Sequence, residues 1–369
     1  MRGAIWLELV SVATACTFAA ACQPTTIIRR SIASGPSVGC AAANCGDPES
    51  VVSITYLGIS GLLVEHGSHV LLTDPFFSNP VATRGPGAVR WLLSGPRITP
   101  DSALIERLLP KSADRASVIL LGHGHYDHLM DVPFIATHRS RTAAIFGGPS
   151  IRHMLIGDRT LRSSPRRMVT IPIESAGDSS REGEWFYSAD SAFRFMAIKA
   201  GHAPTLRLGT WGFTFAEGRL AADMDSLPHM AAEWKLGEPY AFLIDVLSDS
   251  TRTTLFRIYF EDAPSEPPLG SPPAAILANR KVDLAILCAA TSSHVSGAPD
   301  SLLRVLQPRA VMVTHWESFF RSRVGPRALS RATDLRRFAR SLRRTLGPQA
   351  GWIMPVPHAT VRFRVSDLP

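Results

Sequence analysis

The sequence predicts a single α/β domain in which two β-sheets pack face to face with helices on their outer sides. Short apolar runs rich in β-branched residues follow one another from Val51 onward, and Gly, Asp and Pro interrupt them. Helical patterns separate only some of these runs, and this partial alternation favours two sheets in one sandwich. Apolar residues make up 45% of the 369-residue chain, which is enough for a packed core.

The first strands form a predicted meander at residues 51–56, 61–64 and 69–73. Later strands are predicted at residues 117–121, 143–146, 168–172, 193–198, 241–246, 254–260, 282–288 and 310–314, because these runs are short and β-branched. Helices are predicted at residues 101–109, 149–156, 299–306 and 330–346. In the last helix the arginines fall off the apolar stripe, which indicates a solvated face; contact with anionic lipid or a partner is the alternative.

Composition excludes several classes of protein. Charged residues make up 19% of the chain, so it is neither wholly disordered nor a polytopic membrane protein, and five cysteines are too few for a disulfide scaffold. The formal net charge is +8, from 39 Lys and Arg residues of which only four are Lys. With Ala, Gly and Pro also abundant, this bias is typical of genome composition, and we do not expect a nucleic-acid partner.

The N-terminus is predicted to be an export signal. Residues 1–21 combine Arg2, an apolar run and three alanines that end the run. Cys22 follows directly, which resembles the processing site of a bacterial lipoprotein, where this cysteine is lipidated. Glu8 within the run and Ala19 three residues before the cysteine depart from the pattern. Plain secretion and a retained anchor are the alternatives.

Residues 22–48 are rich in Ser, Gly, Pro, Ala and Thr, and we expect them to be a tether that holds a catalytic body, residues 49–369, off a membrane. Cys40 and Cys45 could close a small disulfide loop in an oxidising envelope, or remain two thiols. The expected location is the bacterial cell envelope, with the protein lipid-anchored and facing the periplasm or the exterior.

The most informative segment is His123-Gly124-His125-Tyr126-Asp127-His128, which follows a buried strand. Residues two apart in an extended segment project the same way, so His123 and His125 can bind one metal ion together. Asp127 and His128 lie where a helix begins and can face a second ion about 3.5–4 Å away. Imidazole and carboxylate suit zinc, and also iron or manganese.

This string resembles the HxHxDH signature of the metallo-β-lactamase superfamily. The resemblance covers nearly all of the chain from Val51 onward and implies a four-layer αββα sandwich with one catalytic domain. It also implies that Asp74, at the end of an early strand, orients a ligand histidine; a turn-forming Asp-Pro is the alternative.

The resemblance implies three further metal ligands, each at a strand end. His202 resembles the third histidine of the first metal site. His315 resembles the last histidine, on the second metal, and its His-Trp context is similar to the branch that includes the N-acyl-phosphatidylethanolamine-hydrolysing phospholipase D and the ascorbate-6-phosphate lactonase. Asp262 occupies the position of the bridging aspartate, with Glu261 as the alternative, although the family usually has Gly-Asp-Thr there.

The resemblance implies a hydrolase with two divalent metal ions, zinc in preference to manganese or iron. A hydroxide shared by the two ions would cleave an ester, lactone or phosphodiester bond, and Asp127 would steer its proton. The substrate is expected to be a small molecule or lipid-like. An iron-dependent oxidoreductase on the same fold and a ligand-binding surface lipoprotein without catalysis are the alternatives.

Two residues are candidates for contact with the substrate. Tyr126 lies beside the predicted ligands and could contact substrate or pack in the core, and His294 could line the cleft or be an ordinary loop residue. Five aromatic residues could form an apolar wall at the entrance, with core or edge-strand packing as the favoured alternative: Trp185, Phe186, Trp211, Phe213 and Phe215.

Overall fold

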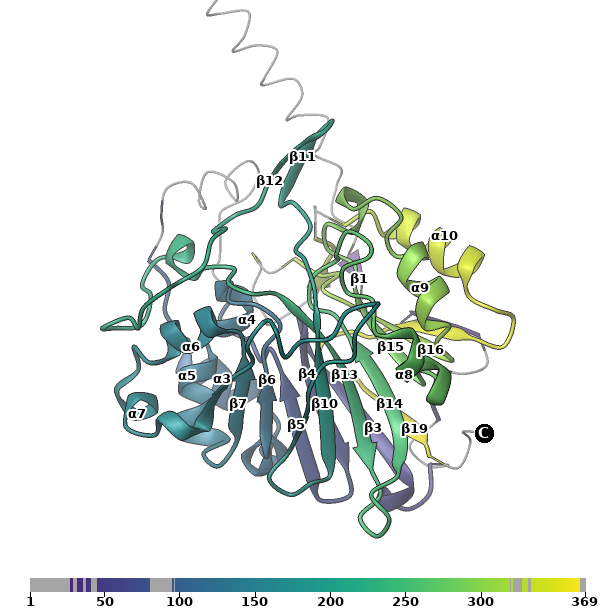
Figure 1. Cartoon of the computed structure of the whole chain (residues 1–369), viewed down its shortest axis with the longest axis horizontal. Helices are drawn as coiled ribbons and strands as arrows, with labels where there is room; N and C mark the ends of the chain where they lie inside the picture. Colours follow the sequence, from purple (N-terminus) through teal and green to yellow (C-terminus); the bar gives the residue numbers. More distant parts are fainter. Residues whose placement is uncertain are drawn as a thin grey trace, which may run out of the picture.

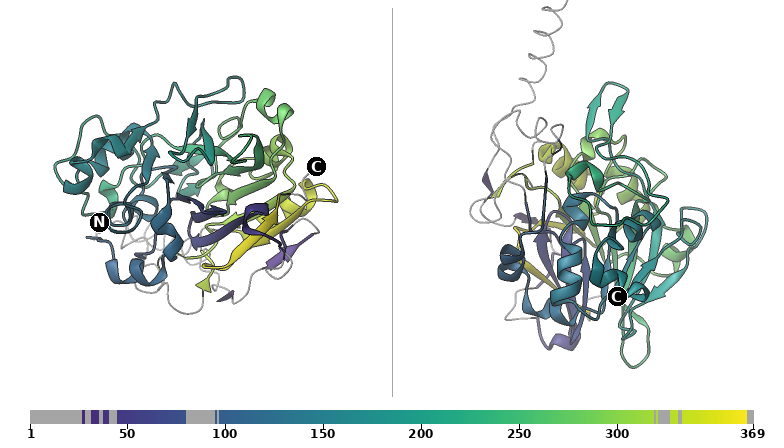
Figure 2. Two further views of the ribbon diagram at one scale, coloured as in Figure 1. Left: turned by 90° about the horizontal axis from the view of Figure 1, so that it is seen from below. Right: turned by 90° about the vertical axis from the view of Figure 1, so that its left-hand side faces the viewer.

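Two mixed β-sheets pack against each other, and helices cover the outer face of each sheet (Figure 1). The computed structural model describes residues 27–28, 32–35, 38–40, 45–79, 95, 97–318, 320, 327–330 and 333–365. In Figure 2 the purple and blue sheet lies beside the teal to green one. The predicted four-layer αββα sandwich is confirmed.

The first sheet has seven strands in the order β19-β3-β4-β5-β6-β7-β8. The strands β3 to β5 form the antiparallel meander, and β5 to β8 run parallel. Alternate residues face opposite layers: Leu62 and Val64 pack between the sheets, whereas Leu63 packs beneath the helices. The bounds are β3 (Val51–Gly58), β4 (Gly61–His66), β5 (His69–Thr73), β6 (Val118–Leu120), β7 (Ala144–Gly147), β8 (Met168–Thr170) and β19 (Thr360–Arg364).

The second sheet has eight strands in the order β2-β18-β16-β15-β14-β13-β10-β9. The strands β14, β15, β16 and β18 run parallel, and the remaining neighbours are antiparallel. The bounds are β2 (Ile32–Ser34), β9 (Trp185–Tyr187), β10 (Phe193–Lys199), β13 (Tyr240–Leu247), β14 (Thr254–Phe260), β15 (Leu284–Cys288), β16 (Ala310–Thr314) and β18 (Gly351–Met354). Two small sheets pair β1 (Ile27–Ile28) with β17 (Arg327–Ala328), and β11 (Leu206–Leu208) with β12 (Trp211–Phe213).

Helices cover the first sheet on one side and the second sheet on the other (Figure 1). The first group is α3 (Ser102–Leu108), α4 (Tyr126–Leu129), α5 (Val132–Phe134), α6 (Pro149–Leu155) and α7 (Arg159–Arg162). The second group is α8 (Ala274–Asn279), α9 (Asp300–Leu306) and α10 (Leu335–Thr345). The short turns are η2 (Pro48–Ser50), η3 (Lys111–Arg115), η4 (Ile135–Arg139), η5 (Pro165–Arg167), η6 (Ala231–Glu233) and η7 (Ser292–His294).

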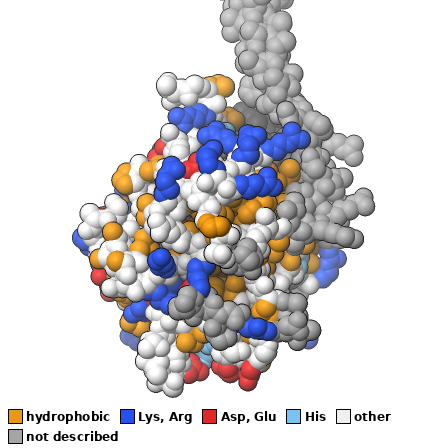
Figure 3. All heavy atoms as spheres, turned by 90° about the vertical axis from the view of Figure 1, so that its right-hand side faces the viewer, with side chains coloured by type: hydrophobic (Ala, Val, Ile, Leu, Met, Phe, Trp, Pro, Cys, Tyr) orange, Lys and Arg blue, Asp and Glu red, His pale blue; other side chains and the backbone are white. Residues whose placement is uncertain are grey.

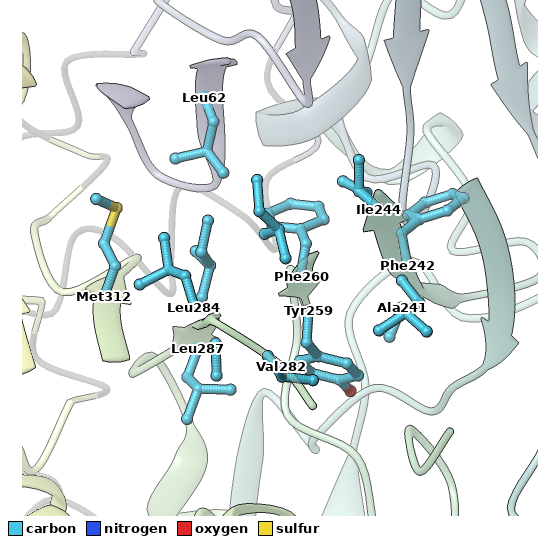
Figure 4. Packing of buried hydrophobic residues seen from close by; sticks show 14 of the residues in the cluster. Leu62, Ala241, Phe242, Ile244, Tyr259, Phe260, Val282, Leu284, Leu287 and Met312 are labelled. Carbon is cyan, nitrogen blue, oxygen red and sulfur yellow. The ribbon is translucent and has the colours of Figure 1, made fainter. Parts of the chain in front are cut away.

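The core lies between the two sheets. Large aromatic side chains from β10, β13 and β14 fill it, among them Phe195, Phe242 and Phe260, all fully buried. Figure 4 shows Phe260 and Leu284 from the second sheet pointing toward Leu62 of the first. Full burial of such a side chain contributes about 1.5–3 kcal/mol, so this layer holds the sheets together.

All eleven predicted strands are present, and the four predicted helices lie where expected, with one shorter. The last helix begins at Leu335 rather than near residue 330, because the Asp334 carboxylate accepts a hydrogen bond from the Arg337 amide and caps it. The predicted meander is present as β3, β4 and β5, and β19 adds a further strand beside β3, a pairing that the sequence prediction did not contain.

Parts of the predicted tether, residues 22–48, pack on the body. The strand β2 pairs with β18 at the edge of the second sheet, and β1 pairs with β17. Cys40 and Cys45, for which the sequence left a disulfide and two thiols open, form a disulfide, and the Cys40 amide donates to the Arg362 carbonyl at 2.7 Å. The prediction of a free tether up to residue 48 is therefore wrong for these segments, because their backbone groups complete sheet edges.

The predicted signal peptide, residues 1–21, and Cys22 lie outside the described residues. Among the residues that the structure describes, no helix has the length and apolar character needed to cross a membrane.

Candidate metal centre

The HxHxDH segment forms a loop between a strand and a helix. The strand β6 ends at Leu120, and α4 begins at Tyr126, so His123 and His125 lie in the extended loop and Asp127 and His128 in the first helical turn. A Cβ on Gly122 would lie 2.1 Å from an Asp262 carboxylate oxygen, and one on Gly124 would lie 2.2 Å from the Lys235 carbonyl. Only glycine therefore fits at these two positions.

Three histidines converge at the first predicted metal site. The Nε2 atom of His123 lies 3.0 Å from the Nδ1 atom of His125, and the ligand atoms of His123, His125 and His202 all lie within 4.8 Å of one another. Two ligand nitrogens on one tetrahedral zinc ion, each at about 2.0–2.1 Å, would be separated by a similar distance. The His202 Nδ1–H donates to the Ala203 carbonyl at 2.7 Å, which leaves its Nε2 lone pair for a metal ion.

A second triad lies next to the first. The Asp127 Oδ2 atom is 3.7 Å from His128 Nε2 and 3.5 Å from His315 Nε2. These three residues also have their ligand atoms within 4.8 Å of one another, and all three are buried. The six residues of the two triads are six of the seven residues expected as ligands.

Asp262 contacts one histidine of each triad, and with His123 and His128 it forms a third group whose ligand atoms all lie within 4.8 Å of one another. Its Oδ2 atom is 2.6 Å from His123 Nδ1, in the first triad, and 3.6 Å from His128 Nδ1, in the second. Glu261, the alternative, is buried at the same strand end but belongs to none of the ligand groups among the described residues. Burial raises the pKa of Glu261 well above its usual value, which favours an uncharged side chain.

Asp74 follows β5 and contacts the loop that carries His123 and His125. Its Oδ1 atom accepts a hydrogen bond from the Gly122 amide at 3.0 Å, and its Oδ2 atom lies 3.5 Å from His128 Nδ1. This position agrees with the predicted orienting role, because an interaction at Nδ1 directs His128 Nε2 toward Asp127.

The electrostatics of the cluster favour bound cations. Asp74, Asp127 and Asp262 are buried carboxylates, and within the described part of the chain their ion-pair partners are all histidines, never Lys or Arg. Burial opposes protonation of His128, but the surrounding carboxylates, Asp127 first, raise its pKa to about 9. Burial raises the pKa of Asp262, and burial together with the charge of Asp262 raises the pKa of Asp74 to about 7, so negative charge is costly here and divalent ions would stabilise it.

His123 and His125 have the protonation state that a metal requires. Burial lowers the pKa of His123 and His125 well below the usual value, so both rings are neutral and keep a lone pair for coordination. Burial works against ionisation of Asp127, but the adjacent His128 and His315 outweigh it and hold its pKa well below the usual range. The donor set therefore fits two divalent ions that accept nitrogen and oxygen ligands.

Sequence analysis missed the residues that hold His315. His315 has a left-handed backbone, φ 51°, and its amide donates to the Ile59 carbonyl at 2.7 Å and to the Tyr56 hydroxyl at 3.0 Å. The Glu317 carboxylate accepts from the Ile59 amide at 2.8 Å and from the Tyr56 hydroxyl at 2.5 Å. An acidic residue two positions after a ligand, directly beyond an apolar strand, is the signal that could have identified Glu317.

The predicted substrate contacts find little support. Tyr126 is 2% exposed and packs beneath the helices with its ring edge against Phe76, so the prediction that it contacts substrate is corrected to a core role. His294 lies in η7, and its ring bonds the Pro204 carbonyl at 2.7 Å, outside all three ligand groups.

The five aromatic residues do not form one wall. Trp185 and Phe186 pack against the core between the sheets, and Phe215 packs against the core beneath the helices. Trp211 and Phe213 are exposed on the β11–β12 hairpin.

No protein-family model matches the sequence, and a comparison with curated proteins also gives no match. Several solved structures are similar to this chain. One is the metallo-hydrolase Igni18 from the archaeon Ignicoccus hospitalis, which is 15% identical in sequence with a TM-score of 0.46. The similarity covers 85% of this chain and 99% of Igni18. The metallo-β-lactamase fold protein YhfI from Bacillus subtilis is 12% identical with a TM-score of 0.42, and the similarity covers 85% of this chain and 99% of YhfI. The diiron β-hydroxylase CmlA from Streptomyces venezuelae is 16% identical with a TM-score of 0.43, and the similarity covers 86% of this chain and 55% of CmlA.

Proposed function

We propose that this chain is a metal-dependent hydrolase of the metallo-β-lactamase superfamily that binds two divalent ions. The observation that supports this most strongly is the convergence of seven side chains from four strand ends into two adjacent triads joined by one carboxylate. The set comprises His123, His125, His202, Asp127, His128, His315 and Asp262.

Each part of the set has its own task. His123, His125 and His202 would hold one ion, and Asp127, His128 and His315 the other, with Asp262 between them. Two ions held in this way supply a hydroxide at neutral pH and stabilise negative charge that develops on the substrate. The chain's own contribution is orientation: Asp74 directs His128, and the Ala203 carbonyl directs His202. Asp127, which stays ionised beside His128 and His315, would steer the proton of the hydroxide as a hydrogen-bond acceptor.

The proposed substrate is an ester, a lactone or a phosphodiester, either a small molecule or lipid-like. Zinc is the proposed metal, because a set rich in neutral imidazoles suits it, and manganese and iron accept the same ligands. We also propose that the protein is lipid-anchored through Cys22 in a bacterial cell envelope, facing the periplasm or the exterior. Mass spectrometry of the N-terminal peptide tests this anchor.

Metal content and hydrolysis of the full chain test the proposed function. Plasma mass spectrometry should give about two ions per wild-type chain, and fewer for His125→Ala and Asp262→Asn. The matched control is His294→Ala, which removes a histidine near the centre but outside the ligand groups and should leave the metal content unchanged.

The zinc- and manganese-loaded proteins should then be screened against lactones, phosphodiesters and phospholipids, and turnover should disappear with His125→Ala. Full activity in Asp262→Asn would contradict the proposal. Stoichiometric iron with oxygen consumption would replace it with redox chemistry.

A further inference from the structure

The hairpin formed by β11 and β12 carries apolar side chains on its exposed surface. Leu208 is 71% exposed, Trp211 57% and Phe213 38%, and the two aromatic rings stack with their centroids 6.3 Å apart. Gly209, with φ +60°, turns the chain tightly between the strands. In Figures 1 and 2 the hairpin projects beyond the body, so the body does not cover these side chains.

Arginines lie next to this hairpin. Arg207 of β11 donates to the His294 carbonyl, and Arg337 of α10 donates to the Ser293 carbonyl at 3.3 Å, so the hairpin and α10 meet at η7. The exposed side of α10 carries Arg336, Arg337, Arg340, Arg343 and Arg344. Among the described residues only Arg344 of these five has a carboxylate partner, Asp300. Figure 3 shows Lys and Arg side chains gathered at this end of the molecule, below the projecting tip.

The hairpin also borders the metal centre. It begins four residues after His202. At the base of the hairpin, the Phe215 amide donates a hydrogen bond to the Thr205 hydroxyl at 3.0 Å. Beyond the base, the Leu236 amide donates to the Ala216 carbonyl, and the Gly124 amide donates to the Leu236 carbonyl, both at about 3 Å. Both ends of the hairpin therefore connect to the loops that carry the predicted ligands.

We propose that the hairpin and the arginine side of α10 form a docking surface for an anionic lipid bilayer. Tryptophan, phenylalanine and leucine partition into the interfacial region of a membrane, and arginines beside them are attracted to anionic headgroups. Docking through this surface would place the loops that carry the predicted ligands next to the lipid. The inference rests on the proposed location in the cell envelope.

The position of the anchor supports this orientation. Cys22 precedes Ile27, in β1, by five residues, and five extended residues span at most about 18 Å. An acylated Cys22 would therefore hold β1 within that distance of the bilayer. The strand β1 pairs with β17, which ends seven residues before α10 begins.

A second copy of the chain fits this surface less well. A twofold interface brings the same patch of both copies together, so the arginines of α10 would approach their own equivalents. Single-stranded nucleic acid also combines stacking with positive charge, but it occupies grooves, whereas this hairpin is a projection.

Vesicle binding by the full chain tests the proposal, with Cys22→Ala in every variant so that no acyl chain contributes. Trp211 emission is isolated as the difference between this protein and its Trp211→Phe variant. With phosphatidylglycerol vesicles we expect this emission to shift to the blue and to be quenched by brominated lipid. Leu208→Ser should weaken binding, whereas the matched control Ile173→Ser, which replaces an exposed apolar residue on another segment, should not.

The charge component is tested separately. Arg336→Gln and Arg340→Gln should each weaken binding to phosphatidylglycerol vesicles about fivefold and leave binding to phosphatidylcholine vesicles unchanged. A Trp211 emission that stays the same while the protein is bound to vesicles would overturn the proposal. So would self-association that Leu208→Ser abolishes, or binding of a single-stranded oligonucleotide that is tighter than vesicle binding.

The proposed anchor can fail independently of this surface. An unmodified Cys22 in the exported wild-type protein would overturn the anchor alone, because the Trp211 measurement does not depend on an acyl chain.

Discussion

At the scale of single residues, the feature that sequence analysis could not supply is the hydrogen bonding behind His315. Its left-handed backbone is unfavourable for a residue with a side chain, and two hydrogen bonds to its amide hold it there. The buried Glu317 fixes both acceptors by binding the Tyr56 hydroxyl and the Ile59 amide. Glu317 is therefore a positioning residue for the second triad.

Glu317→Gln should weaken binding of one of the two metal ions by about tenfold or more. The Tyr56 hydroxyl and the Ile59 amide both donate to the Glu317 carboxylate. A glutamine side chain would present an N–H donor to one of these two donors, so one hydrogen bond that positions His315 would be lost. Metal titration of the chelated protein should show one weakened site. The control is Glu65→Gln on β4, which should bind both ions as wild type does; equal weakening of both sites in Glu317→Gln would contradict the positioning role.

The candidate site could be predicted residue by residue wherever its ligands follow a strand directly. His123, His125, Asp127 and His128 form one local string, and the resemblance to the metallo-β-lactamase superfamily implied His202, Asp262 and His315 at the ends of later strands. Tyr126 was misplaced because position in the string does not tell which side of a helix faces the core. Its ring lies on the core side of α4, against Phe76.

At the scale of elements, one polar contact ties the two sheets together. His69 begins β5 in the first sheet, and its ring bonds Asp190, in the turn between β9 and β10, at 2.9 Å. Its second nitrogen lies 3.5 Å from Asp249, after β13. Partial burial lowers the pKa of His69, but the hydrogen bond and charge of Asp190 and the charge of Asp249 outweigh it, and the pKa is raised above 6.5.

His69→Asn should therefore destabilise the protein more at pH 5.5 than at pH 9. The pKa of His69 is higher in the folded protein than in the unfolded chain, where it is near 6.5. The contact therefore stabilises the folded protein fully below pH 6.5, and this stabilisation is lost as the pH rises through the pKa of the folded state. The difference should be no more than about 1 kcal/mol, because the contact is partly exposed. Urea unfolding at both pH values measures it. The exposed His138→Asn is the control, and a loss from His69→Asn that is equal at both pH values would contradict the assignment.

Elements were predictable where they were apolar and locally patterned. The runs that became β13, β14 and β16 are strongly apolar, and each strand lies within one or two residues of its prediction. The strand β19 was missed because Thr360–Arg364 alternates apolar residues with arginine and threonine, and only pairing with β3 makes it a strand. The hairpin of β11 and β12 is a pairing of the same kind.

At the scale of the whole molecule, the layer between the sheets supplies much of the stability. Phe260→Ala should lower the free energy of unfolding by about 3–5 kcal/mol, because it opens a cavity in a fully buried position. Phe213→Ala removes the same ring from the exposed hairpin and should change stability by less than about 0.5 kcal/mol. Chemical denaturation compares the two, and equal losses would show that the core assignment is wrong.

Metal removal should also act on the whole molecule. Ions that bind only the folded chain stabilise it by mass action, about 2.7 kcal/mol at a free concentration one hundred times Kd. Chelation should therefore lower the melting temperature of the wild type, and zinc should restore it. Asp262→Asn, which should bind fewer ions, should show a smaller rise in melting temperature with zinc than the wild type. A wild-type melting temperature that zinc does not change would contradict a resident metal centre.

The pairing of β19 with β3 joins nearly the last part of the chain to nearly the first part of the domain. The first sheet therefore cannot close during synthesis or export until residues 360–364 have emerged. A gene with a stop codon that removes residues 360–369 would encode every predicted ligand. Its product would still leave the long edge of β3 unpaired, and neighbouring nascent chains would compete to occupy that edge.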